Sequence, residues 1–164
     1  MDEKTFTNKE ILTEVRALLQ SIDYQLEEPE IPKEFMGKPD FYGKRRKGEI
    51  THEIGGFVKE DVKEISRGVA QLWTIRRQLG EDMDYVIALP PLNEADLVDI
   101  MLADNNKLLK KIRRENFQIW LCNPKEKNIC CVFGTPHDSL FAQHLKYKDL
   151  NMESHTFLRE VKSE

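Results

Sequence analysis

Residues 38–78 read KPDFYGKRRKGEITHEIGGFVKEDVKEISRGVAQLWTIRRQ, and this stretch decides the fold. Residues 38–42 and 50–58 look extended, and they flank a basic segment that Gly43 and Gly48 bracket. Two extended segments joined by a glycine-bounded, charged turn are typical of a β-hairpin. The sequence therefore predicts a hairpin whose basic tip points into solvent.

Helices are expected on both sides of this hairpin. Thr7 and Glu10 have the spacing of a capping box, and the apolar residues that follow recur at helical spacing, which predicts a helix over residues 9–21. A second helix is predicted over residues 60–79, with Gly80 as its C-cap. The apolar stripe of this second helix consists of Val62, Ile65, Val69, Leu72 and Trp73.

The rest of the chain continues the alternation of strands and helices. Residues 85–89 form a short apolar run before Pro90-Pro91, as expected for a strand buried on both faces. A helix is predicted over residues 94–115, and Asp104-Asn105-Asn106 is a candidate break within it. The remaining expected elements are a short strand at 24–26, strands at 118–122 and 128–133, and a short helix at 139–145.

This order predicts an α/β fold with a mixed sheet of about five strands flanked by helices. We expect an α/β domain over residues 1–136 and a C-terminal extension over residues 137–164 that is partly helical or frayed.

The composition suits a globular protein rather than a disordered one, with 40% apolar and 33% charged residues and a net charge of -4. No apolar run is long enough to cross a bilayer and the start lacks a signal-peptide pattern, so we expect a cytoplasmic protein without a membrane partner. The cysteines fall in apolar segments without zinc-site spacing, which predicts reduced core thiols at Cys122, Cys130 and Cys131.

The order of these motifs resembles the core of the PD-(D/E)xK nuclease superfamily, which implies a restriction-endonuclease-like fold. In that family an Asp and a Glu on neighbouring strands hold a divalent metal, and a Lys two residues after the Glu assists phosphodiester hydrolysis. The resemblance assigns these roles to Asp40 and Glu53, with Mg²⁺ or Mn²⁺ as the cofactor if the protein is active. Gly55 then stands where the lysine is expected, and Glu14 is a candidate additional metal ligand.

A polar stripe on the helix at 60–79 offers a replacement for that lysine. The stripe recurs every four residues, and in some members of the superfamily the lysine is carried on this helix. We therefore count Lys59 and Lys63 as candidate catalytic residues and Arg67 and Gln71 as candidate nucleic-acid contacts. The alternative is that this stripe is the ordinary solvent face of an amphipathic helix.

DNA is the expected partner, because four adjacent cations at the hairpin tip can contact phosphates without reading bases. These candidate contacts are Lys44, Arg45, Arg46 and Lys47. A second basic cluster lies near the end of the helix at 94–115. The alternative for both clusters is that they are ordinary solvated faces. The second cluster consists of Lys107, Lys110, Lys111, Arg113 and Arg114.

Three functions follow as hypotheses. The first is a metal-dependent nuclease acting on DNA phosphodiesters. The second is a catalytically inactive nuclease-fold protein that binds nucleic acid or a protein partner as a scaffold. The third is a small α/β interaction protein, and a homodimer is compatible with all three.

Overall fold

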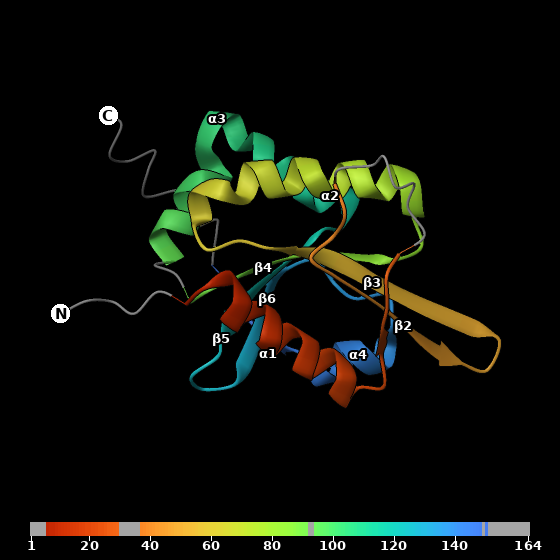
Figure 1. Ribbon diagram of the computed structural model, residues 1–164. Coiled ribbons are helices and arrows are strands. Elements are labelled where there is room, and N and C mark those ends of the chain that lie inside the picture. Colours follow the sequence, from red (N-terminus) through yellow and green to blue (C-terminus); the bar gives the residue numbers. More distant parts are fainter. Residues whose placement is uncertain (1–5, 30–36, 92–93, 149, 151–164) are drawn as a thin grey trace, which may run out of the picture.

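The computed structural model describes residues 6–29, 37–91, 94–148 and 150 (Figure 1). Its centre is a seven-stranded sheet in which the strands follow one another in chain order. The prediction of a mixed sheet flanked by helices is confirmed. The short strand expected at 24–26 is the edge strand β1, and the edge strand β7 was not predicted. The strands are β1 (Gln25–Leu26), β2 (Phe41–Lys47), β3 (Ile50–Val58), β4 (Asp84–Leu89), β5 (Gln118–Asn123), β6 (Asn128–Phe133) and β7 (Lys146–Tyr147).

Both faces of the sheet are covered by helices (Figure 1). One face packs against α1 (Asn8–Ser21) and α4 (Ser139–His144), and the other packs against α2 (Ile65–Leu79) and α3 (Glu94–Glu115). The capping box predicted at the start of α1 is present, with the Thr7 hydroxyl accepting from the Glu10 N–H and the Glu10 carboxylate accepting from the Thr7 N–H.

The strand directions follow from the connections. The β2–β3 hairpin is antiparallel, whereas β3, β4 and β5 are parallel because α2 and α3 carry the chain back between them. The buried strand predicted at 85–89 is β4, where every residue is buried. Strands β3 and β5 flank β4, and helices cover both of its faces, so no part of β4 reaches solvent. This explains the continuous apolar run at residues 85–89.

Helix α2 begins later than the sequence predicts, because a single 3₁₀ turn (Val62–Glu64) precedes it. Its buried face consists of Ile65, Gly68, Val69, Leu72 and Ile75. Trp73 lies beside this face and is 39% exposed, so its assignment to the apolar stripe was wrong. Instead, the indole ring lies on the outer surface of the α2–α3 layer.

The break predicted in the third helix is confirmed. Asp104, Asn105 and Asn106 have φ values of 53°, 58° and 61°, which are left-handed backbone conformations that no α-helix contains. Asn and Asp tolerate this region better than most residues, since their short side chains form local hydrogen bonds. The second half of α3 is therefore a separate helical segment that begins at about residue 107.

The described part of the C-terminal extension belongs to the same packed unit as the rest. The short helix expected at 139–145 is α4, and its Phe141 is fully buried against the α1 side of the sheet. Strand β7 pairs in parallel with β6. The packed part thus continues past residue 136, while residues 151–164 lie outside the described ranges.

Two further expectations concern cysteines and membranes. All three cysteines are free, and burial raises the pKa of the Cys131 thiol to about 12, so it stays protonated in the core. Within the described ranges, none of the helices has the length and apolarity needed to cross a bilayer.

Candidate functional site

Asp40 lies at the start of the hairpin, where its backbone already follows the β2–β3 ladder. Phe41 pairs with Gly56, and the Asp40 N–H donates to the Gly56 carbonyl at 2.8 Å. The next position of this antiparallel ladder sets Asp40 opposite Phe57. The Asp40 carboxylate accepts a hydrogen bond from the Val58 N–H at 2.8 Å, so one of its oxygens is held by the neighbouring strand.

Glu53 lies far from Asp40 on the same ladder. It pairs with Lys44, four ladder positions from Asp40, which corresponds to about 13 Å along the strands. The Tyr42 hydroxyl donates to the Glu53 carboxylate at 2.6 Å. The structure therefore does not bring the two predicted metal ligands together. Gly55, placed by the sequence at the lysine position, lies opposite Tyr42.

The ladder identifies the position that does face Asp40. Phe57 is 3% exposed and packs with α2 in the core. Lys59 follows two residues later and is 8% exposed, with its ammonium nitrogen 5.6 Å from the centre of the Phe57 ring. The hairpin register thus sets Phe57, which carries no carboxylate, opposite Asp40, with Lys59 two residues further along the chain.

The other predicted catalytic residues lie away from Glu53. Lys59 is six residues beyond Glu53 along the extended chain, about 20 Å away, and Lys63 follows in the exposed 3₁₀ turn. Neither lysine can reach over Glu53. Glu14 faces a hollow lined by Lys127 and other residues on the α1 side of the sheet, opposite the side to which Tyr42 and its partner Glu53 belong.

The donor set does not fit a magnesium or manganese ion. Such ions take several hard oxygen ligands in close geometry, and the position facing Asp40 supplies none. In the part of the chain that the structure describes, no group of three His, Cys, Asp or Glu side chains is placed to hold a metal. The predicted set of Asp40, Glu53 and Glu14 is spread over both faces of the sheet.

The predicted helix contacts have mixed surroundings. Arg67 is exposed on α2, as a nucleic-acid contact requires. Gln71 lies one turn further on and is half-buried, and its side-chain oxygen is buried without a hydrogen-bond partner. The stripe of Lys59, Lys63, Arg67 and Gln71 is therefore neither a plain solvent face nor a single cluster around Glu53.

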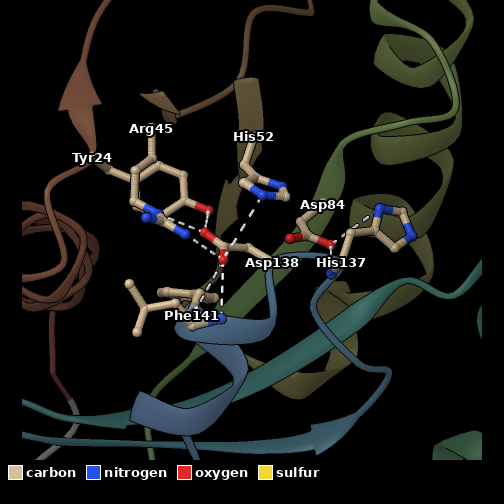
Figure 2. Close-up of polar contacts among 8 residues, drawn as sticks. Tyr24, Arg45, His52, Asp84, His137, Asp138 and Phe141 are labelled. Carbon is tan, nitrogen blue, oxygen red and sulfur yellow. Dashed lines mark hydrogen bonds and ion pairs between the residues drawn. The ribbon is translucent and has the colours of Figure 1, made fainter. Parts of the chain in front are cut away.

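A buried ion pair at the other end of the hairpin was missed by the sequence analysis (Figure 2). Arg45, predicted to be an exposed phosphate contact, is 6% exposed. Its guanidinium donates to both carboxylate oxygens of Asp138, at 2.7 and 2.5 Å. The Tyr24 hydroxyl donates to the same carboxylate at 3.1 Å. Arg45 is thus removed from the set of nucleic-acid contacts, because its donors are engaged inside the protein.

Neighbouring groups extend this cluster, as Figure 2 shows. The His52 Nε2 atom lies 4.0 Å from Oδ1 of Asp138. The buried Asp84 carboxylate accepts a hydrogen bond from the backbone N–H of His137 at 2.9 Å. Burial raises the pKa of Asp84, and the His137 contacts only partly oppose this. Asp138 also caps α4, accepting from the N–H groups of Leu140 and Phe141. The cluster therefore fixes α4 to the hairpin.

Asp138 gives the fold a dependence on acid pH. Burial alone would raise its pKa, but the hydrogen bonds from Arg45 and Tyr24 outweigh this and lower it from 3.8 to about 2. A carboxyl group with a lowered folded-state pKa stabilises the fold above its unfolded pKa, and this stabilisation is lost as the pH falls from about 4 to about 2.

We expect the difference in free energy of unfolding between the wild type and Asp138→Asn to shrink by about 2 kcal/mol from pH 5 to pH 2. Urea unfolding at a series of pH values measures it. A difference that stays constant over this range would mean that Asp138 titrates as it does in the unfolded chain.

The hairpin tip retains two exposed cations. Lys44 forms an ion pair with Glu27 at 3.2 Å, while Arg46 and Lys47 are exposed. Of the four predicted nucleic-acid contacts at the tip, Arg45 is buried and Lys44 is paired with the Glu27 carboxylate. The tip is therefore a weaker electrostatic anchor than its sequence indicates.

These observations define an α/β protein with a mixed sheet covered by helices on both faces. No protein-family model and no curated protein matches the sequence. Among solved structures, an XisH family protein from Nostoc punctiforme is 13% identical, with 73% of this chain and 95% of that chain covered and a TM-score of 0.45. An fdxN element excision controlling factor protein from Anabaena variabilis is 12% identical, with 74% and 95% covered and a TM-score of 0.45. Neither similarity carries a residue role or an activity to this chain.

Proposed function

We propose that this protein is a nuclease-fold protein that has lost phosphodiester hydrolysis and acts by binding nucleic acid. The observation that supports the loss is the residue facing Asp40. Where the PD-(D/E)xK pattern has a second carboxylate, this chain has Phe57, which is buried under α2. The first of the three hypotheses, an active nuclease, therefore gives way to the second.

The chemistry of the remaining residues agrees with this proposal. Hydrolysis of this type depends on a metal-bound water whose pKa the ion lowers, and two or more carboxylates normally hold that ion. Asp40 alone, with one oxygen engaged by the Val58 N–H, is a poor ligand set. Lys59 packs over an aromatic ring, where it contributes a cation–π contact.

Binding is supported by the uneven distribution of charge. The chain as a whole carries a net charge of -4, yet residues 107–114 hold five Lys and Arg residues and no Asp or Glu. A local excess of cations is what binding to phosphates requires, whatever the net charge of the protein. A protein partner is the competing interpretation, and the experiment below separates the two.

We expect no cleavage of single-stranded, duplex or branched DNA by the wild type in Mg²⁺ or Mn²⁺, together with measurable binding at low salt. Labelled substrates resolved on a denaturing gel test the first expectation, and fluorescence anisotropy tests the second. Asp40→Ala and Glu53→Ala should both bind as the wild type does, since neither side chain is a metal ligand here.

Metal-dependent cleavage that disappears in Asp40→Ala would overturn the proposal and restore the active nuclease. Absence of binding to every nucleic acid tested, at low salt and with folded protein, would instead favour a protein partner.

A further inference from the structure

We propose that the outer surface between α2 and the second half of α3 is the nucleic-acid interface, and that it binds single strands, with phosphates on the α3 lysines and a base against Trp73. The inference rests on the proposed function and names its site. We define the α2–α3 surface by residues of α2 and of the second half of α3, two helices that cover the same face of the sheet (Figure 1). These are Ser66, Val69, Trp73, Arg77, Lys107, Leu108, Lys110, Lys111 and Arg114.

The cations of α3 lie on one face of the helix. The break at residues 104–106 restarts α3, and the cationic residues then recur at spacings of three, four and seven along one helix face. This face extends about 10 Å along the helix axis. Lys107, Lys110, Lys111 and Arg114 line a hollow of about 630 Å³ there, with Asp104 as its single carboxylate.

The lysines of this surface are not neutralised by any carboxylate in the part of the chain that the structure describes. Among the described residues, no carboxylate forms an ion pair with Lys107, Lys110 or Lys111. By contrast, Arg45 and Lys44 of the hairpin are each paired with an acid. Arg114 of the same hollow is paired with Glu115. Three lysines that no described carboxylate pairs, gathered in one hollow, attract an anion more strongly than the hairpin tip does.

An aromatic ring lies beside these cations. Trp73 is one of three large hydrophobic side chains exposed in the described ranges, and it lies between charged neighbours. The Arg77 guanidinium is 4.9 Å and the Lys111 ammonium 5.8 Å from the indole ring. A second hollow, of about 350 Å³ with Val69 and Leu108 in its lining, shares Lys107 and Lys111 with the first.

An exposed indole next to a cationic groove is the arrangement by which proteins bind unpaired bases. Bases stack on aromatic rings while the backbone follows the positive groove, and this binding tolerates any sequence. Paired bases are stacked on one another and offer no free face to Trp73. The α2–α3 surface should therefore prefer single strands to duplex and should read little sequence.

Two tryptophans make the test direct. Trp73 is exposed, whereas Trp120 is fully buried, so a bound base can quench only the emission of Trp73. Titration with an oligothymidylate of about 20 nucleotides should quench the wild-type tryptophan emission, and the quenching should vanish in Trp73→Phe. In Trp73→Ala, which removes the stacking ring, affinity measured by anisotropy should fall about 5- to 150-fold, since stacking contributes about 1–3 kcal/mol per base.

Charge is tested with a matched pair of double variants. Lys107→Gln/Lys110→Gln removes two cations from the hollow, and Arg46→Gln/Lys47→Gln removes two exposed cations from the hairpin tip. For single strands, the first variant should lower the slope of log affinity against log salt by about 1.4, whereas the second should leave it near the wild-type value.

The outcomes separate this inference from the proposed function. A wild type that binds no nucleic acid would contradict the proposed function itself. A wild type that binds equally well after the α3 substitutions, or that binds without quenching Trp73, would overturn the α2–α3 surface alone. Duplex bound as tightly as single strands would overturn the assignment to unpaired bases. Unchanged thermal unfolding midpoints, expected for these exposed side chains, confirm that every variant is folded.

Discussion

Replacement of Arg45 by methionine is expected to lower the free energy of unfolding by about 3–5 kcal/mol, because it leaves the Asp138 carboxylate buried without its counter-ion. Asp138 is 1% exposed and Arg45 is 6% exposed, so water cannot take over the lost interaction. Among the described residues, the Tyr24 hydroxyl and the two α4 N–H groups would remain as its hydrogen-bond donors. Urea unfolding at pH 7 measures the change.

The control is Arg46→Met, the same substitution one residue further along β2. Arg46 is exposed, and substitutions of this kind change stability by about 0.5 kcal/mol or less. The double variant Arg45→Met/Asp138→Asn should recover part of the loss, because it removes the unpaired charge while the amide oxygen still caps α4. Equal, small effects of Arg45→Met and Arg46→Met would show that the pair contributes nothing to stability.

This pair also shows which part of the structure the sequence could not supply. Arg45 stands within a run of four basic residues, and such a run is typical of a solvated turn. Its partner lies 93 residues away, in the segment with the weakest pattern of the chain. A single sequence contains no signal that joins two such positions, because the pairing depends on how α4 folds back against the hairpin.

The sequence predicts, by contrast, that a hairpin forms here, but it does not predict which residues pair across it. The glycines predict a turn between Gly43 and Gly48, whereas the turn is Gly48-Glu49, with β2 ending at Lys47 and β3 beginning at Ile50. Gly48 has a φ of 64°, the left-handed conformation that favours glycine in tight hairpins. A two-residue turn at Gly48-Glu49 fixes the register of the hairpin. In that register Phe57, and no residue near Glu53, lies opposite Asp40.

Asp40 and the residue opposite it therefore differ in how far the sequence could predict them. Asp40 follows a proline before an extended run, and this local pattern identified it correctly as the start of the hairpin. The identity of its opposite residue is a property of the ladder, and a shift in register changes it entirely. The elements with strong periodicity, α1, α2 and β4, were predicted within a few residues because each buries one continuous apolar face or core.

Gly56→Ala is expected to destabilise the protein by about 3–5 kcal/mol, because a side chain there would collide with the neighbouring backbone. A Cβ built on Gly56 would lie 1.9 Å from the Val86 carbonyl oxygen and 2.8 Å from the Phe41 ring. Gly56 and Val86 are paired in the parallel β3–β4 ladder, so relief requires these strands to separate. The close approach of the Val86 backbone is therefore the reason for a glycine here.

The adjacent glycine provides the control, since the same substitution at Gly55 meets flexible atoms. Its Cβ would lie 3.1 Å from the terminal methyl of Met83, which can move, and 3.4 Å from the Phe41 carbonyl oxygen. Gly55→Ala also restricts the unfolded chain, which offsets about 0.4–1 kcal/mol of any loss. Thermal and urea unfolding of the two variants should therefore differ by at least about 2 kcal/mol. Equal stability of the two variants would mean that β3 and β4 can separate freely at Gly56, and the close pairing of Gly56 with Val86 would then lose its support.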